Sequence, residues 1–80
     1  MKQIKDIKEL KEIAKDEYID CFIKLNGGIR YSKDIQFAEG KFYVFNSIDG
    51  TDDELTEEQL FDVDYSNVGD ALNKGALFRY

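Results

Sequence analysis

The alternation of apolar and polar residues changes its period near residue 18. In residues 2–17, apolar side chains recur every three or four positions, as on one face of a helix. Beyond them the period is two, which is typical of strands with one buried face. This alternation predicts strands over residues 18–25, 29–37 and 41–48. We therefore expect an N-terminal helix that packs on a sheet.

Short turns separate the predicted strands and favour antiparallel pairing. Asn26-Gly27-Gly28 is a strong hairpin signal, because asparagine and glycine adopt positive φ angles at little cost. Ala38-Glu39-Gly40 predicts a second turn. Lys33 interrupts the apolar face of the middle strand, which favours a bulge or an exposed edge at that position.

The C-terminal part of the sequence predicts two short helices. Residues 49–54 predict an acidic turn, and Thr56-Glu-Glu-Gln59 has the capping-box pattern that starts a helix. A second helix is expected over residues 66–74, ended by a glycine. Residues 76–80 are long enough for a fourth strand. The sequence thus predicts a single α+β domain over residues 1–80, with an N-terminal helix on a three- or four-stranded, mostly antiparallel sheet.

The third predicted strand is apolar on both faces, as in a strand that is covered on both sides of a sheet. One N-terminal helix covers only one face. The other face would carry four aromatic residues: Tyr18, Phe22, Tyr43 and Phe45. The C-terminal segment, a second copy of the chain or a binding partner could cover that face.

Acidic residues concentrate between residues 39 and 64. This region holds nine acids and one lysine, a net charge of −8, and the remaining residues hold ten bases and eight acids, so the region accounts for the whole net charge of −6. A strong local charge of one sign attracts partners of the opposite sign. We expect a partner-binding site in the acidic segment and the aromatic strand before it: Tyr43, Phe45, Asp49, Asp52, Asp53, Glu54, Glu57 and Glu58. The alternative is a solvated turn followed by a well-capped helix, because acids in the first turn of a helix are favoured by its dipole.

The composition argues against several classes of function. Histidine, the commonest general base and transition-metal ligand, is absent, so we expect neither an enzyme nor a metal site. The single cysteine, Cys21, excludes an internal disulfide, and the alternation places it in the core. No apolar run approaches the roughly 18 residues of a membrane span, and the N-terminus lacks a signal-peptide pattern. We expect a cytoplasmic protein with no cofactor and no membrane contact.

Two further segments do not meet the requirements of the motifs that they resemble. Residues 49–58 have the composition of a calcium loop, but Asp52 stands where the EF-hand needs glycine and no helix precedes the loop. Residues 40–45 resemble the aromatic strand of RNA-recognition domains, but they are out of register and lie beside acids. Phosphate binding requires clustered lysine and arginine. We therefore expect no direct binding of nucleic acid.

The run from Ile48 to Leu60, followed by the run from Ser66 to Gly75, resembles small uncharacterised proteins carried by phages and mobile elements of low-GC Gram-positive bacteria. The resemblance covers about the C-terminal half of the chain, and this family has no activity to transfer. Small acidic phage proteins often resemble inhibitors of host enzymes. The resemblance therefore favours an acidic segment that imitates the phosphates of a nucleic acid.

These patterns predict a small protein-binding module that regulates or inhibits a nucleic-acid-binding protein. The alternative is a structural homodimer joined through the aromatic face of its sheet, in which the acids maintain solubility. Salt distinguishes the two, because it weakens charge-driven binding and leaves apolar association intact.

Overall fold

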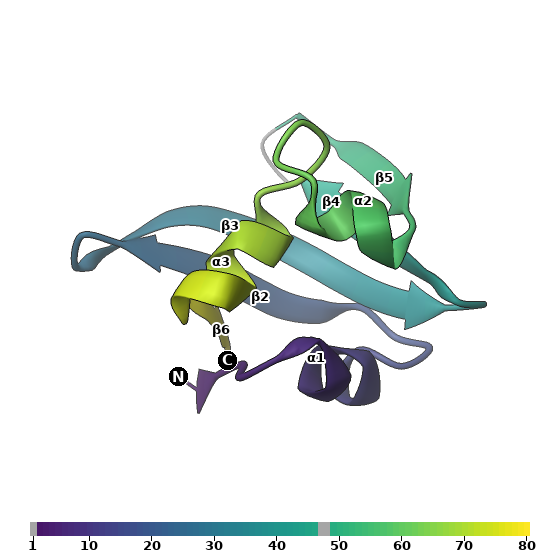
Figure 1. Ribbon diagram of the computed structural model, residues 1–80, viewed down its shortest axis with the longest axis horizontal. Coiled ribbons are helices and arrows are strands. Elements are labelled where there is room, and N and C mark those ends of the chain that lie inside the picture. Colours follow the sequence, from purple (N-terminus) through teal and green to yellow (C-terminus); the bar gives the residue numbers. More distant parts are fainter. Residues whose placement is uncertain (1, 47–48) are drawn as a thin grey trace.

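The computed structural model describes residues 2–46 and 49–80 and shows a six-stranded sheet with three short helices. In chain order the elements are β1 (Lys2–Gln3), α1 (Ile7–Ile13), β2 (Ile19–Leu25), β3 (Gly28–Ala38), β4 (Lys41–Asn46), β5 (Thr51–Leu55), α2 (Glu57–Phe61), α3 (Val68–Lys74) and β6 (Leu77–Arg79). The strands lie in the order β1-β6-β2-β3-β4-β5, and each pairs antiparallel with its neighbours (Figure 1). The predicted α+β class is confirmed.

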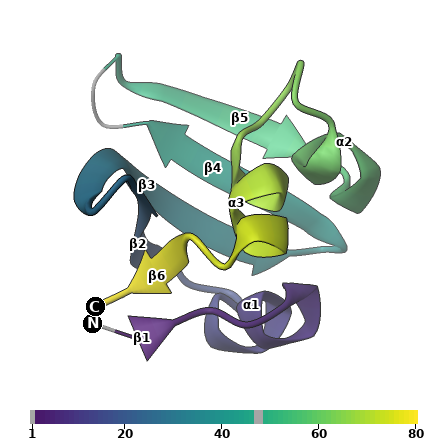
Figure 2. The ribbon, with the colours of Figure 1, turned by 60° about the vertical axis from the view of Figure 1, so that its left-hand side comes forward.

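All three helices lie on the same side of the sheet (Figures 1 and 2). Leu10 of α1, Leu60 of α2 and Leu72 of α3 belong to one hydrophobic core with strand residues such as Ile35 and Phe42. Full burial of such a side chain contributes about 1.5–3 kcal/mol to folding. The main hydrophobic core therefore lies between the helices and this face of the sheet.

The N-terminal segment differs from the prediction of one helix over residues 2–17. The helix α1 is shorter because its flanks pair with strands: Lys2 lies opposite Arg79 of β6, and Lys15 bridges to Phe37 of β3. The carboxylate of Asp6 starts the helix by accepting a hydrogen bond from the backbone N–H of Glu9 at 2.8 Å. Long-range pairing at both ends thus overrides the local helical pattern.

The acidic segment also differs from the prediction, because residues 51–55 form the edge strand β5 and not a turn. The backbone of β5 pairs with β4, with Thr51 opposite Asn46 and Leu55 opposite Phe42. Leu55 is buried, and this burial together with the ladder overrides the low strand propensity of the acids. The predicted end of the preceding strand at residues 47–48 lies outside the described residues.

The strand β3 is also more central than the sequence suggested. It pairs with both β2 and β4, so Lys33 lies neither at an edge nor at a bulge. The register shift of the β2–β3 pair falls between Ile23 and Lys24, which lie opposite Tyr31 and Ile29, so the extra residue of β3 is at position 30 and not at Lys33.

The remaining C-terminal predictions are confirmed. The hydroxyl of Thr56 accepts a hydrogen bond from the N–H of Gln59 at 3.1 Å, and the Gln59 side chain accepts one from the N–H of Thr56 at 3.0 Å. The helix α3 ends at Gly75, which has a φ of 68°. The strand β6 then enters the sheet between β1 and β2. In the described parts of the chain, no helix has both the length and the apolar composition that a membrane span requires.

Candidate functional site

The side of the sheet opposite the helices has no helix over it in the part of the chain that the structure describes. Strand residues alternate between the two faces, so the neighbours of the core residues Cys21, Ile35 and Val44 point away from the helices. We call this surface the open face, and it comprises Tyr18, Asp20, Phe22, Lys24, Ser32, Asp34, Gln36, Lys41, Tyr43, Phe45, Asp52, Glu54, Phe78 and Tyr80. The C-terminal helices, one of the three covers suggested by the sequence, lie on the other side.

Carboxylates and aromatic rings lie side by side on the open face. Asp20 of β2 lies opposite Asp34 of β3, Asp34 opposite Phe45 of β4, and Phe45 opposite Asp52 of β5. Neighbouring strands are about 4.8 Å apart, so these four residues form one continuous row across the sheet. In a second row, Tyr43 of β4 lies opposite Glu54 of β5.

Hydrogen bonds hold the two carboxylates of β5 on this face. The hydroxyl of Tyr18 donates to Oδ2 of Asp52 at 2.9 Å, and the hydroxyl of Tyr43 donates to Oε1 of Glu54 at 3.1 Å. Lys41 Nζ also donates to Oε1 of Glu54, at 3.2 Å. Hydrogen bonds from Lys41 and Tyr43 lower the pKa of Glu54, and the hydrogen bond to Glu54 raises the pKa of Tyr43. Both effects keep Glu54 ionised and Tyr43 neutral near pH 7.

Asp20 and Asp34 form a pair of like charges directly opposite each other. The pKa of Asp34 is raised, first by its partial burial and then by the hydrogen bond to Asp20 and the repulsion from it. Like charges in directly opposite positions of a ladder destabilise the sheet. A positive group placed on this part of the open face would relieve the repulsion.

The other end of the open face is aromatic. The ring of Phe22 stacks on Phe78 with their centroids 5.9 Å apart, and it contacts Tyr80 at 4.8 Å. Lys24 Nζ lies 5.4 Å from the centroid of Phe78. These contacts bury Phe22 completely, whereas Tyr80 is 71% exposed.

The structure divides the eight residues that the sequence predicted as one binding site. Tyr43, Phe45, Asp52 and Glu54 share the open face, whereas Asp53 alternates to the opposite face of β5. Asp49 lies in the connection before β5, where its carboxylate accepts hydrogen bonds from the N–H and hydroxyl of Thr51 and its pKa is thereby lowered. These contacts give Asp49 a local structural role.

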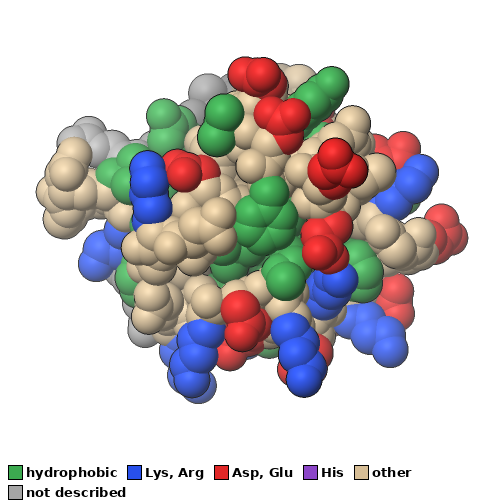
Figure 3. Space-filling model, viewed as in Figure 1, with side chains coloured by type: hydrophobic (Ala, Val, Ile, Leu, Met, Phe, Trp, Pro, Cys, Tyr) green, Lys and Arg blue, Asp and Glu red, His purple; other side chains and the backbone are tan. Residues whose placement is uncertain are grey.

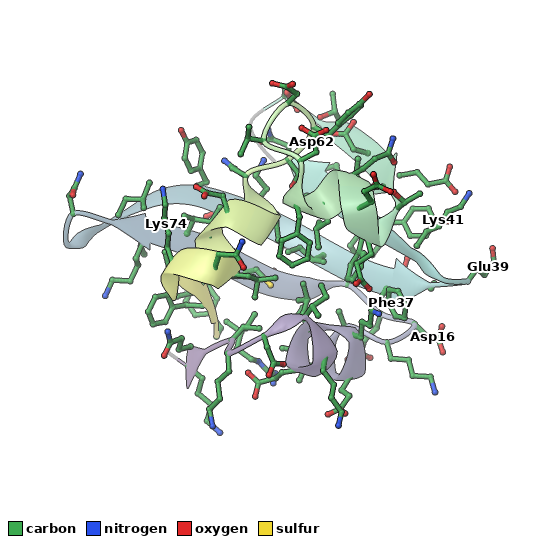
Figure 4. All side chains as sticks on the ribbon, viewed as in Figure 1. Asp16, Phe37, Glu39, Lys41, Asp62 and Lys74 are labelled. Atoms are coloured by element: carbon green, nitrogen blue, oxygen red, sulfur yellow. The ribbon has the colours of Figure 1, made fainter. Side chains whose placement is uncertain are left out.

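Glu57 and Glu58 lie in the first turn of α2, on the helix side. Glu57 forms an ion pair with Lys11 of α1. Two other acids of the region lie outside the strands of the open face: Glu39 lies in the β3–β4 turn and Asp62 follows α2 (Figure 4). The helix side carries charges of both signs (Figure 3), so the acidic region does not form one continuous negative surface.

Two carboxylates of the open face, Asp20 and Asp34, were missed by the sequence analysis, and Tyr18 was expected on the aromatic face but not among the eight binding residues. The sequence does carry a signal for Asp20 and Asp34. A two-residue turn at Asn26 and Gly27 places each odd-numbered residue of β2 opposite an even-numbered residue of β3. The apolar residues of both strands stand at odd positions, so this register would put them on opposite faces of the sheet. One extra residue must therefore lie between them, and the observed register shift brings Asp20 and Asp34 together.

The described residues offer little for catalysis. Burial raises the pKa of the Cys21 thiol to about 12, so the thiolate needed for nucleophilic chemistry is not populated at neutral pH. Within residues 2–46 and 49–80, no three cysteine or carboxylate side chains converge as metal ligands. The open face offers carboxylates for positive groups and rings for apolar or planar ones.

Comparisons with protein-family models, with curated proteins and with solved structures found no match for this chain.

Proposed function

We propose that the protein is a non-enzymatic binding module whose open face binds a positively charged surface of another protein. In this proposal it regulates or inhibits a nucleic-acid-binding protein by occupying the surface on which phosphates would otherwise lie. The observation that carries the proposal is the row of carboxylates and rings on a sheet face that no described helix covers.

The charge of the open face supports a basic partner. Four carboxylates and two described lysines lie on it; Lys41 is paired with Glu54 and Lys24 lies over Phe78, so Asp20, Asp34 and Asp52 carry the excess negative charge. Negative charge of this kind attracts basic protein surfaces, speeds their association and repels nucleic acid itself. The rings between the carboxylates supply apolar contact area once the charges have brought the two surfaces together.

Two matched double variants test the proposal. Asp52→Asn with Glu54→Gln removes two negative charges from the open face, and Glu57→Gln with Glu58→Gln removes two from the helix side. Each immobilised form is exposed to a cell lysate at low salt, and retained proteins are then displaced with duplex DNA or RNA. We expect the native protein and the helix-side variant to retain the same nucleic-acid-binding protein, and the open-face variant to lose it.

Two results would contradict this proposal. Equal retention by all three forms would show that the open-face charges are not used. Retention that neither added DNA nor RNA reduces would show that the protein does not occupy a phosphate-binding surface. Salt provides an independent check, because the retained complex should weaken steeply between low and high ionic strength.

The alternative function, a homodimer through the open face, is favoured by one observation, the aromatic end with its exposed Tyr80. Such a dimer would bring two sets of carboxylates together, so salt would strengthen it. Sedimentation at increasing protein concentration distinguishes the two: a mass that rises with salt supports the dimer, and a constant monomer mass removes it.

A further inference from the structure

A shallow pocket of about 310 Å³ opens on the acidic end of the open face. Its lining consists of Tyr18, Asp34, Phe45 and Asp52, two aromatic rings and two carboxylates. None of these four residues is basic, so the pocket contains negative charge without a positive group of its own.

The strand register sets the geometry of this pocket. Phe45 lies opposite Asp34 on one side and opposite Asp52 on the other. The two carboxylates therefore come from strands roughly 10 Å apart, with the ring of Phe45 between them. Tyr18 reaches across from the start of β2 to Asp52, with its hydroxyl 2.9 Å from Oδ2, and so forms a third wall.

Both carboxylates can accept further hydrogen bonds. An ionised carboxylate has about four lone-pair sites. Asp52 uses one of them for Tyr18, and Asp34 shares one contact with Asp20. The lysines nearest in the fold are directed elsewhere: Lys41 contacts Glu54, and Lys33 alternates to the helix side of β3.

We infer that this pocket binds the guanidinium group of an arginine side chain of the partner protein, stacked on Phe45 and hydrogen-bonded to Asp34 and Asp52. The inference rests on the proposed function, since that function supplies a basic partner. In this inference one arginine of the partner supplies a large share of the binding free energy, as a few residues do in most protein interfaces.

Arginine fits this pocket better than lysine or a metal ion. The guanidinium is planar, stacks on aromatic rings and donates five hydrogen bonds in a fixed fork, whereas the lysine ammonium is a strongly hydrated point charge. A divalent cation needs several oxygens that converge at 2.0–2.6 Å or so. Asp34 and Asp52 are held apart by the strand that carries Phe45, so they do not converge on one ion.

The test uses three small probes that differ in one group: acetyl-Gly-Arg-Gly-amide, its lysine counterpart and its citrulline counterpart. Citrulline keeps the shape of arginine and lacks its charge. Each probe is titrated into ¹⁵N-labelled protein at low salt, and amide shifts in the two-dimensional spectrum give the site and the affinity. We expect the arginine probe to shift the amide signals of Asp34, Phe45 and Asp52. Its affinity should be about two- to fivefold higher than that of the lysine probe, and the difference from the citrulline probe should be larger still.

Variants then assign the contacts. Phe45→Leu keeps an apolar side chain and should abolish the preference for arginine over lysine, and Asp52→Asn should weaken arginine binding about threefold or more. Glu58→Gln removes one negative charge from the helix side, and it should change neither the affinity for the arginine probe nor that for the lysine probe. Urea unfolding of each variant confirms that the fold is retained.

Two outcomes would overturn the inference, and they bear differently on the proposed function. If arginine and lysine bind the open face equally, or Phe45→Leu leaves the preference intact, the arginine pocket is wrong and the acidic face remains as a general basic-surface binder. If no probe shifts the open face, the pocket is wrong as well. The proposed function fails separately, and only if the capture experiment shows no role for Asp52 and Glu54.

Discussion

The pair of Asp20 and Asp34 shows how a single contact on the open face acts against the stability of the fold. The raised pKa of Asp34 means that the folded state binds a proton more readily than the unfolded state. Stability from this site is therefore present at acidic pH, and it decreases as the pH rises from the ordinary pKa of an aspartate through the raised one. Above the raised pKa of Asp34 this site therefore acts against folding.

Replacing one partner of this pair should stabilise the protein at neutral pH. We expect Asp34→Asn to raise the free energy of unfolding by about 0.2–1 kcal/mol at pH 7, because it removes a directly opposed like charge. The gain should shrink as the pH falls through the raised pKa of Asp34, because a protonated Asp34 no longer repels its neighbour. Urea unfolding between pH 3 and 7 measures it. Asp53→Asn is the matched control, since Asp53 lies opposite Val44 and should give no comparable gain.

Gly69 marks the closest approach of α2 and α3. A Cβ atom there would lie 2.5 Å from Cα of Phe61 and 2.6 Å from the carbonyl oxygen of Leu60. These are backbone atoms, which cannot move aside without shifting a helix. We expect Gly69→Ala to destabilise the protein by about 1–3 kcal/mol. Gly28→Ala is a suitable control, because a Cβ at Gly28 would have no neighbour within 4 Å. Equal thermal stability of the two variants would contradict this packing argument.

At the scale of elements, the sequence was sufficient where the signal is local. The capping box at Thr56 and Gln59 correctly predicted the start of α2, and Gly75 correctly predicted the end of α3. Each signal is a hydrogen bond or a backbone conformation within a few residues. Such contacts do not depend on the rest of the fold.

The sequence was insufficient where distant segments decide the structure. Residues 2–3 became β1 because β6 lies beside them, and α1 shortened accordingly. The strand β5 forms because its backbone pairs with β4, although its acidic residues have little strand propensity of their own. A signal for β5 was nevertheless present, since Asp49-Gly50 after an aromatic strand is a hairpin pattern. For the same reason Asp53 points away from Asp52 and Glu54, because successive residues of a strand face opposite sides of the sheet.

The capping box also gives a prediction for α2. Thr56→Ala removes the acceptor of the N–H of Gln59, and we expect a loss of about 0.5–2 kcal/mol in the free energy of unfolding. Thr56→Ser keeps the hydroxyl and should lose much less. Chemical denaturation of both variants tests the helix start, and a full loss in the serine variant would assign the effect to the threonine methyl group instead.

At the scale of the whole molecule, the hydrophobic core and the proposed binding surface lie on opposite sides of one sheet. The helices and their core occupy one side, and the charged and aromatic rows occupy the other. Changes on the open face should therefore affect partners more than the fold. This separation is what makes the matched charge variants of the two sides informative.

The last strand along the described chain is central to this architecture. The strand β6 pairs with β1 on one side and β2 on the other, and Leu77 is fully buried. We expect a chain ending at residue 76 to lose cooperative unfolding, because β1 loses its partner and the core is opened. Removal of Tyr80 alone, which is 71% exposed, should leave a cooperative transition. Circular dichroism during thermal unfolding checks both chains.

The position of β6 also limits when the protein can fold in a cell. A ribosome makes β1 and β2 well before β6, the strand that lies between them in the sheet. Until residues 77–79 leave the exit tunnel, the edge of β2 is unpaired and the core beside it is open. The β2–β3–β4–β5 meander can form earlier, because each strand pairs with the next one along the chain. Closure of the sheet must therefore wait for β6, and a chain without it presents an unpaired strand edge to chaperones and proteases.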